Sequence, residues 1–179
     1  MKFAFVGPVA VLCAVATAFI VTGCSPSLDW RETRPEGADV VALFPCRPDR
    51  HARPVTVAGA STTMEMLVCS AAGATFALSF LDMADPAAVT AAVLELRATA
   101  LANIAGAQLS SVPLQVGGMT AHPQAALLSM TGRLPDGTAT QEQAAFFVKG
   151  LRVFQASVTG AKLISEMTDT FFAGLKLPS

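Results

Sequence analysis

Apolar and polar residues alternate along several short segments of this 179-residue chain. In residues 75–81 the large apolar side chains of Phe76, Leu78 and Phe80 stand at every second position, with smaller residues between them. A period of two residues is typical of a β-strand with one buried face. Other β-rich segments predict further strands. They cover residues 38–45, 55–58, 62–70, 108–116, 124–134, 140–150 and 151–158.

A long helix is predicted after the strand at 75–81. Asp85 is a suitable N-cap residue, and Pro86 is favoured at the first helical position. Apolar residues then recur at helical spacing to Ile104 and form one continuous stripe, so the helix should pack on a sheet by one face. The stripe consists of Val89, Val93, Leu96, Ala100 and Ile104.

A second amphipathic helix is predicted near the C-terminus, because Ile164, Met167, Phe171 and Leu175 also recur at helical spacing. The order of elements is therefore strands, helix, strands, helix. One antiparallel β-sheet with helices packed on it accounts for this order and places the chain in the α+β class. We expect a single domain over residues 38–179.

The segment 46–54 is basic and rich in turn-forming residues, so we expect a loop there. Arg47, Arg50, His51 and Arg53 gather positive charge within it. As a contact surface, these side chains would bind anionic lipid head groups or an acidic partner. The alternative is an ordinary solvated loop.

The loop with the sequence GGMTAHP is a second candidate contact surface. Its paired glycines, Gly117 and Gly118, would let the backbone of a partner approach closely. His122 follows them and is expected at the surface rather than as a ligand. The alternative is a flexible connection between two strands.

The first 23 residues have the layout of a secretory signal peptide. A short basic start at Lys2 precedes a long uncharged apolar run, and small residues lead to Cys24. The run is also about as long as a bilayer core is thick, so an uncleaved single-pass membrane anchor is the alternative.

The end of this apolar run, Val21-Thr22-Gly23-Cys24, resembles the lipobox of bacterial lipoproteins. The resemblance implies that the sulfur of Cys24 receives a diacylglycerol and that the signal is cut after Gly23. It also implies that the new amino terminus is acylated with a fatty acid such as palmitate. Acyl chains of this kind would hold the protein stably at a membrane.

The residues after Cys24 refine the expected location. In the lipoproteins that this chain resembles, a residue such as Ser25 favours export to the outer membrane, with the domain facing the periplasm. Residues 24–37 are polar, contain prolines and show no periodicity. They predict a flexible tether between the lipid and the domain.

Charge and cysteine content change this view little. Loss of residues 1–23 removes one of 12 basic side chains and none of 13 acidic ones, leaving 156 nearly neutral residues. This balance argues against nucleic-acid binding through phosphate contacts.

Cys46 and Cys69 are the two cysteines that remain unmodified in the mature chain, and in an oxidising compartment they predict a disulfide. Two buried free thiols are the alternative.

Five sequence segments, taken in order, resemble the PsbP-like α/β/α sandwich. They are LFPCRP, TFALSFLDM before an Asp-Pro-capped helix, HPQAALLSMTG after a Gly-Gly loop, AAFFVKGLRVFQASVTG, and TDTFFAGLKL. The resemblance covers about residues 40–177. It implies that fold and a mostly non-catalytic role in larger assemblies. The family shares no set of active-site residues that could be assigned to this chain.

We find no sequence pattern for catalysis, for a metal or for another cofactor. Nucleophile-elbow, Walker, HExxH and CxxC motifs are absent from the sequence. His51 and His122 are the only histidines, and 71 residues separate them. Glu65 is a candidate buried acid, although alternation with its methionine neighbours favours the solvent face of a strand. No catalytic residue is therefore predicted.

These observations predict a lipid-anchored, non-catalytic envelope protein that binds an unknown envelope protein or assists an assembly. One alternative is a carrier of a small ligand or lipid, using the gap between the sheet and the helix at 87–104. A large apolar pocket would favour a carrier, whereas a filled core would argue against it. An enzyme would need a cleft with at least two convergent polar side chains.

Overall fold

The computed structural model describes Met1 and residues 28–178. The predicted signal segment, its apolar helix, Gly23 and Cys24 therefore lie outside the described residues. Among the residues that are described, no helix has both the length and the apolar character needed to cross a bilayer.

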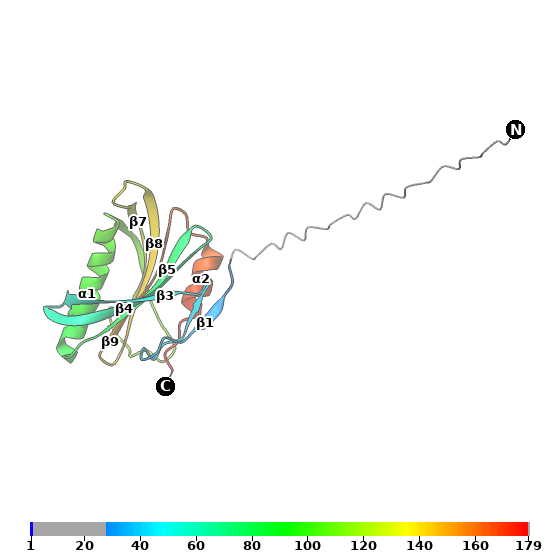
Figure 1. The fold of residues 1–179 in the computed structure, drawn as a ribbon. Coiled ribbons are helices and arrows are strands. Elements are labelled where there is room, and N and C mark those ends of the chain that lie inside the picture. The colour runs from blue at the N-terminus through cyan, green and yellow to red at the C-terminus, as the bar shows by residue number, and fades with distance from the viewer. Residues whose placement is uncertain (2–27, 179) are drawn as a thin grey trace.

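A seven-stranded sheet forms the centre of the domain (Figure 1). All neighbouring strands in it are antiparallel, and helices lie on its two sides. The α+β class predicted from the sequence is therefore confirmed. In spatial order the strands are β3 (Asp49–Val57), β4 (Ala60–Ala71), β5 (Ala74–Asp82), β9 (Arg152–Gly160), β8 (Ala139–Lys149), β7 (Ala126–Arg133) and β6 (Ala107–Pro113).

Two meanders make up the sheet. β3, β4 and β5 form the first by tight turns, and β6 to β9 form the second. Helix α1 (Pro86–Asn103) carries the chain from β5 in the interior of the sheet to β6 at its far edge. The second meander then returns, so that β9 pairs with β5. The order of elements predicted from the sequence thus closes into one sheet.

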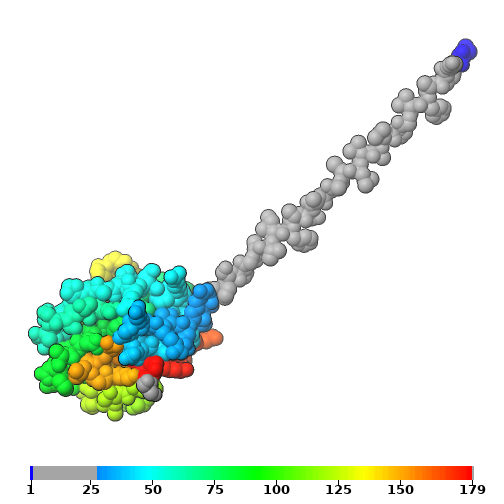
Figure 2. Space-filling view, turned by 60° about the horizontal axis from the view of Figure 1, so that its bottom comes forward, coloured from blue at the N-terminus to red at the C-terminus, as the bar shows by residue number. Residues whose placement is uncertain are grey.

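Helix α2 (Ser165–Ala173) covers one face of the sheet, together with a small sheet of β1 (Arg31–Thr33) and β2 (Ala42–Phe44). Aromatic residues fill this core, and their side chains are fully buried. They are Phe44, Phe76, Phe147, Phe154 and Phe171. The blue residues at the start of the domain lie beside the red C-terminal residues in Figure 2. Val41 and Lys176 exchange two backbone hydrogen bonds there, of 2.8 and 2.9 Å.

Helix α1 packs on the other face of the sheet, as the sequence predicted. The Asp85 side chain caps it by accepting a hydrogen bond from the Ala87 backbone N–H at 2.8 Å, and Pro86 begins the helix. The apolar stripe is buried against aliphatic side chains of the strands, with Phe146 among them. The buried stripe residues are Val89, Val93, Leu96, Ala100 and Ile104.

The loop predicted over residues 46–54 is wrong for most of its length, because β3 begins at Asp49. β3 is an edge strand that pairs only with β4, and nearly all of its side chains are exposed. An edge strand tolerates charged residues, and also Pro54, whose missing N–H can face away from the sheet. Its composition therefore looks like that of a loop.

The N-terminal part of the domain also differs from the prediction. Residues 38–45 do not form a strand of the main sheet; only Ala42–Phe44 is a strand, and it pairs with β1. Part of the flexible tether expected over residues 24–37 belongs to the fold, since Trp30 packs on Phe76 and Arg31–Thr33 is paired. Leu28, ten residues before the expected domain boundary, is already packed on the core.

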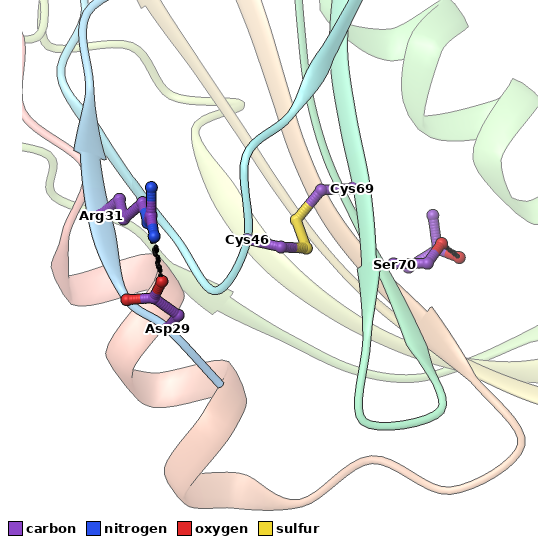
Figure 3. The surroundings of a disulfide bond; sticks show 6 residues. Asp29, Arg31, Cys46, Cys69 and Ser70 are labelled. Atoms are coloured by element: carbon purple, nitrogen blue, oxygen red, sulfur yellow. Dashed lines mark hydrogen bonds and ion pairs between the residues drawn. A yellow bond between two sulfur atoms is a disulfide. The ribbon is translucent and has the colours of Figure 1, made fainter. Parts of the chain in front are cut away.

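A disulfide joins Cys46, just before β3, to Cys69 in β4 (Figure 3). The two Cα atoms are 6.0 Å apart. The bond ties the chain between β2 and β3 to the α2-side core, where Cys69 is buried and Cys46 packs against the apolar cluster. The pairing is the one that the sequence indicated.

Candidate functional site

A groove runs along α1 where the helix leaves part of the sheet uncovered. Its volume is about 290 Å³. From Leu96 to Asn103 the helix forms one wall about 10 Å long, at a rise of 1.5 Å per residue. Strands β4, β5, β8 and β9 supply the floor. We call this the α1 groove. Its polar lining residues are Arg53, Ser79, Thr99, Asn103, Glu142, Gln155, Ser157 and Thr159, and its apolar lining residues are Met64, Met66, Ala77, Leu96, Ile104 and Leu134.

The part of the α1 groove floor that β9 supplies is polar because of strand alternation. Gln155, Ser157 and Thr159 point to the α1 side, whereas the residues between them are buried in the aromatic core on the other side. The aliphatic part of this face ends at Val153, which α1 covers. Beyond Val153 the strand offers an amide and two hydroxyl groups to whatever occupies the groove.

Glu142 is the most unusual residue of the α1 groove. Its side chain is only 6% exposed, and no hydrogen bond or ion pair to its carboxyl group is formed within residues 28–178. Burial raises the pKa of Glu142 from 4.5 to about 7, because the charged form loses hydration without gaining a partner. A neutral carboxyl group both donates and accepts hydrogen bonds. Glu142 is thus available to a polar ligand.

A larger cavity of about 440 Å³ lies at the opposite end of β9 but suits a ligand less well. Two of its four charged side chains are paired, because Arg152 donates two hydrogen bonds to the carboxylate of Asp82, both of 2.7 Å; Asp39 and Lys149 are the other two. The pKa of Asp82 is lowered by these bonds. Arg152 and Asp82 in this cavity are therefore already bonded to each other, whereas the carboxyl group of Glu142 in the α1 groove has no partner among residues 28–178.

The predicted basic surface is divided by the geometry of β3. Arg47, Arg50, His51 and Arg53 are all exposed, but alternation sends Arg50 to one face of the sheet and His51 and Arg53 to the other. Arg50 donates to the Glu65 carboxylate at 2.7 Å. Only Arg53 reaches the α1 groove. The four side chains therefore do not form one patch.

Glu65 is not a buried acid. Its side chain is partly exposed and accepts hydrogen bonds from Arg50, which also donates to the Glu36 carbonyl at 3.1 Å. The methionines on either side of it, Met64 and Met66, line the α1 groove on the opposite face of the sheet. The solvent-face interpretation of Glu65 was the better one.

The glycine pair in the loop before β7 contacts the protein's own chain. A Cβ atom on Gly118 would lie 1.8 Å from the Leu177 carbonyl oxygen, and Gly118 has a positive φ of 81°. Gly117 accepts a hydrogen bond from the Leu177 N–H at 2.8 Å. The close backbone approach expected from an external partner is thus made by the C-terminal segment.

His122 holds the same loop to α1. Its Nε2 atom lies 3.1 Å from the Thr90 hydroxyl, and its Nδ1 atom accepts a hydrogen bond from the Gln124 N–H at 3.2 Å. These contacts make His122 a structural link rather than a free surface residue. Within the part of the chain that the structure describes, no three His, Cys, Asp or Glu side chains gather at one point to hold a metal ion.

Sequence reasoning missed Glu142, although the signal was present. In the segment TQEQAAFFV, Glu142 shares the period of two with Ala144 and Phe146, whereas Gln141 and Gln143 occupy the other face. A carboxyl group in register with large apolar residues on a central strand is expected to be buried. The same alternation that we applied to Glu65 would have identified it.

No family model matches the chain, and no curated protein matches it. Among solved structures, a protein from Bacteroides thetaiotaomicron is similar over 83% of this chain, with 12% identity and a TM-score of 0.46. This chain spans about half of that protein, namely 48% of it. A protein of unknown function from Pseudomonas aeruginosa, PA94, shares 14% identity, with a TM-score of 0.38, over 73% of this chain and 82% of its own. Neither likeness carries an argument about function.

Proposed function

We propose that this chain is a lipid-anchored, non-catalytic binding protein of the bacterial envelope, and that the α1 groove holds a small polar ligand. The observation that carries the proposal is Glu142, a largely buried residue whose carboxyl group lines the groove, keeps some contact with solvent and has no hydrogen-bond partner among residues 28–178. Burial removes part of the hydration of this carboxyl group. A ligand that forms a hydrogen bond with it would replace the lost water contacts.

The groove chemistry favours a ligand with several hydroxyl or amide groups. Ser157 and Thr159 offer hydroxyl groups, Gln155 and Asn103 offer amides, and Glu142 offers a carboxyl group. All of these form directed hydrogen bonds with neutral polar groups. The length and volume of the groove suit a compact molecule rather than a folded protein domain.

A lipid carrier is less well supported. The space between the sheet and α1 is filled by apolar side chains, all of them buried, such as Val93, Ala92 and Phe146. A filled core leaves no apolar cavity for an acyl chain there. The cavity that does exist lies beside α1, and the polar side chains of β9 line it together with Met64, Met66 and Ala77. It therefore supports the carrier alternative for a ligand that has both polar groups and some apolar surface.

Binding is also better supported than catalysis. A hydrolytic nucleophile needs a base within hydrogen-bonding distance. Among residues 28–178, Glu142 forms no hydrogen bond with Ser157 or with Thr159. Convergent polar side chains are present in the groove, but they are arranged as separate hydrogen-bonding groups.

The location in the envelope rests on the sequence. The segment Val21-Thr22-Gly23-Cys24 supports lipid attachment, and the Cys46–Cys69 disulfide suits an exported protein. A sheet between two helices agrees with the architecture that the PsbP-like resemblance implies. An outer-membrane protein facing the periplasm is the corresponding proposal.

Native mass spectrometry of the protein purified from its membrane tests the ligand. We expect a non-covalent adduct of low mass on the wild-type protein and its loss from Ser157→Phe, which fills the groove. Ser110→Phe is the matched control, because Ser110 is exposed on the edge strand β6, away from the groove. An adduct that survives Ser157→Phe in a folded protein would place the ligand elsewhere.

Fractionation and mass spectrometry of Cys24→Ala test the anchor separately. The wild-type protein should begin at Cys24 and carry acyl chains, whereas the variant should lose them and keep its signal uncut. A variant with an unchanged membrane pool would instead support the single-pass anchor.

A further inference from the structure

We propose that the end of the domain that carries Leu28 rests on the membrane surface, where Leu28, Trp30, Ala72 and Ile164 contact lipid. We call these four residues the N-terminal patch. The inference rests on the proposed lipid attachment at Cys24 but concerns a different surface from the α1 groove. Its occupant is the bilayer that holds the acyl chains.

A short length of chain joins Cys24 to the fold. Leu28 is packed on the core, Trp30 contacts Phe76, and Asp29 donates its N–H to the Pro45 carbonyl at 2.8 Å. Four residue steps separate Leu28 from Cys24, and four steps span at most about 14 Å. An acylated Cys24 would therefore keep this end of the domain close to the bilayer.

The surface near Leu28 is apolar. Ile164, just before α2, is 55% exposed, although it is a large aliphatic residue. Leu28, Trp30, Ala72 and Ile164 line one cavity of about 210 Å³, into which Met167 also reaches. In Figure 2 orange residues of the C-terminal part adjoin the blue residues at which the described chain begins. The patch is thus continuous and open to a surface.

Trp30 suits a position at the membrane interface. One side of its ring packs edge-on against Phe76, with ring centroids 6.0 Å apart, and the side chain also lines the cavity of the N-terminal patch. Tryptophan is enriched where an apolar layer meets water, because its ring is apolar and its N–H is polar. Trp30 would be held in place by the core and presented to lipid.

Charges around the patch nearly cancel. Asp29 pairs with Arg31 through a hydrogen bond of 2.9 Å, and the exposed side chains of Lys162 and Glu166 have opposite signs. An electrostatic attraction to anionic lipid is therefore not the main force. We expect the contact to persist when salt screens surface charges.

The opposite end of β9 provides a matched comparison. β9 runs from Arg152 to Gly160, and its nine residues span about 30 Å. Leu151, at the far end, is also an exposed aliphatic residue, but it adjoins the ion pair of Arg152 with Asp82. Ser165 at the near end and Ala84 at the far end are both small and exposed, so a labelled cysteine can replace either of them.

The test uses the full-length acylated protein in vesicles of phosphatidylethanolamine and phosphatidylglycerol that contain brominated lipid. Trp30 is the only tryptophan, so its fluorescence reports on this end alone. We expect its emission to be quenched at low and at high salt. Ile164→Glu should reduce the quenching, whereas Leu151→Glu should leave it unchanged.

A second readout compares Ser165→Cys with Ala84→Cys, each labelled with bimane, in vesicles that contain spin-labelled lipid. Stronger quenching at position 165 supports the inference. Equal quenching at both positions, or none at either, overturns it when mass spectrometry shows that Cys24 is acylated. A bare thiol at Cys24 would instead remove the proposed anchor and this inference with it, while ligand binding in the α1 groove would stand.

Discussion

The face of the sheet under α2 is built from aromatic side chains, whereas the face under α1 is aliphatic and ends in a polar groove. On the α2 side, Phe171 contacts Phe44 and Phe76 edge-on, with ring centroids 5.4 and 5.3 Å apart. The disulfide between Cys46 and Cys69 belongs to the same core. On the α1 side, the helix covers β9 only at Val153, and the groove lies beyond it. We call the α2 side the sealed face, because its aromatic side chains are fully buried, although the cavity lined by Leu28 and Trp30 adjoins it. We call the α1 side the open face, because the groove exposes part of the sheet along the helix.

The comparison shows that one strand can serve stability and binding independently. In β9, Phe154 and Ala156 are fully buried in the sealed face, while Gln155 and Ser157 line the α1 groove. Because alternate side chains point to opposite faces, substitutions in the groove need not disturb the aromatic core.

The largest effect is expected from Phe171→Ala on the sealed face. The side chain is fully buried among aromatic rings, so its loss leaves a cavity. We expect the free energy of unfolding to fall by about 3–5 kcal/mol, measured by urea denaturation.

Ser157→Ala in the α1 groove is the control, and we expect it to change stability little. The comparison between the faces fails if the two variants are destabilised to a similar extent.

Loss of the disulfide should have the next largest effect. Cys46 and Cys69 are 23 positions apart, and closing a loop of this size stabilises a domain by about 3 kcal/mol in the chain-entropy model. The double variant Cys46→Ser/Cys69→Ser should therefore unfold at a lower urea concentration. Reduction of the wild-type protein should lower its midpoint to a similar value, and a midpoint unaffected by reductant would show that the thiols are not bridged in the purified protein.

Most of the fold was predictable from the sequence because periodicity reflects burial. The α1 stripe and the alternation of Phe76, Leu78 and Phe80 follow directly from packing on one face. β3 was not predictable in this way, since an edge strand with one partner needs no apolar pattern. The pairing of Arg31–Thr33 with β2 depends on tertiary contacts that leave no local signal.

The α1 groove was less predictable than the fold. The sequence shows that Ser157 and Thr159 share a face, but not where α1 stops covering that face. Glu142 could have been found by alternation, whereas its lack of a partner depends on which side chains surround it in space. The contact made by Gly118 with Leu177 likewise depends on the folded C-terminus.

The open face should give the protein a distinctive pH dependence. The pKa of Glu142 in the folded protein, about 7, is above its unfolded value of 4.5, so folding favours the protonated form. The resulting stabilisation is fully present below pH 4.5 and is lost as pH rises through about 7. Glu142→Gln should remove this change, which amounts to roughly 2–3 kcal/mol, and should be more stable than the wild-type protein at pH 8.

The matched control is Glu166→Gln, which alters an exposed carboxylate on α2. Urea denaturation across pH 4.5 to 8 should give this variant the slope of the wild-type protein. If Glu142→Gln also keeps that slope, Glu142 is ionised at neutral pH and has a partner that the groove geometry does not show.

The smallest effect is expected at the start of α1, the helix that covers the open face. Asp85→Ala removes the side-chain oxygen that accepts the Ala87 N–H, and loss of such a cap costs about 1 kcal/mol. Asp85→Asn keeps an acceptor oxygen and should be close to the wild-type protein. Hydrogen exchange should then become faster in the first turn of α1 while the amides of β9 stay protected. Faster exchange throughout β9 would mean that α1 and the aromatic layer open together, because a sheet whose two faces were independent would not transmit the loss of one cap.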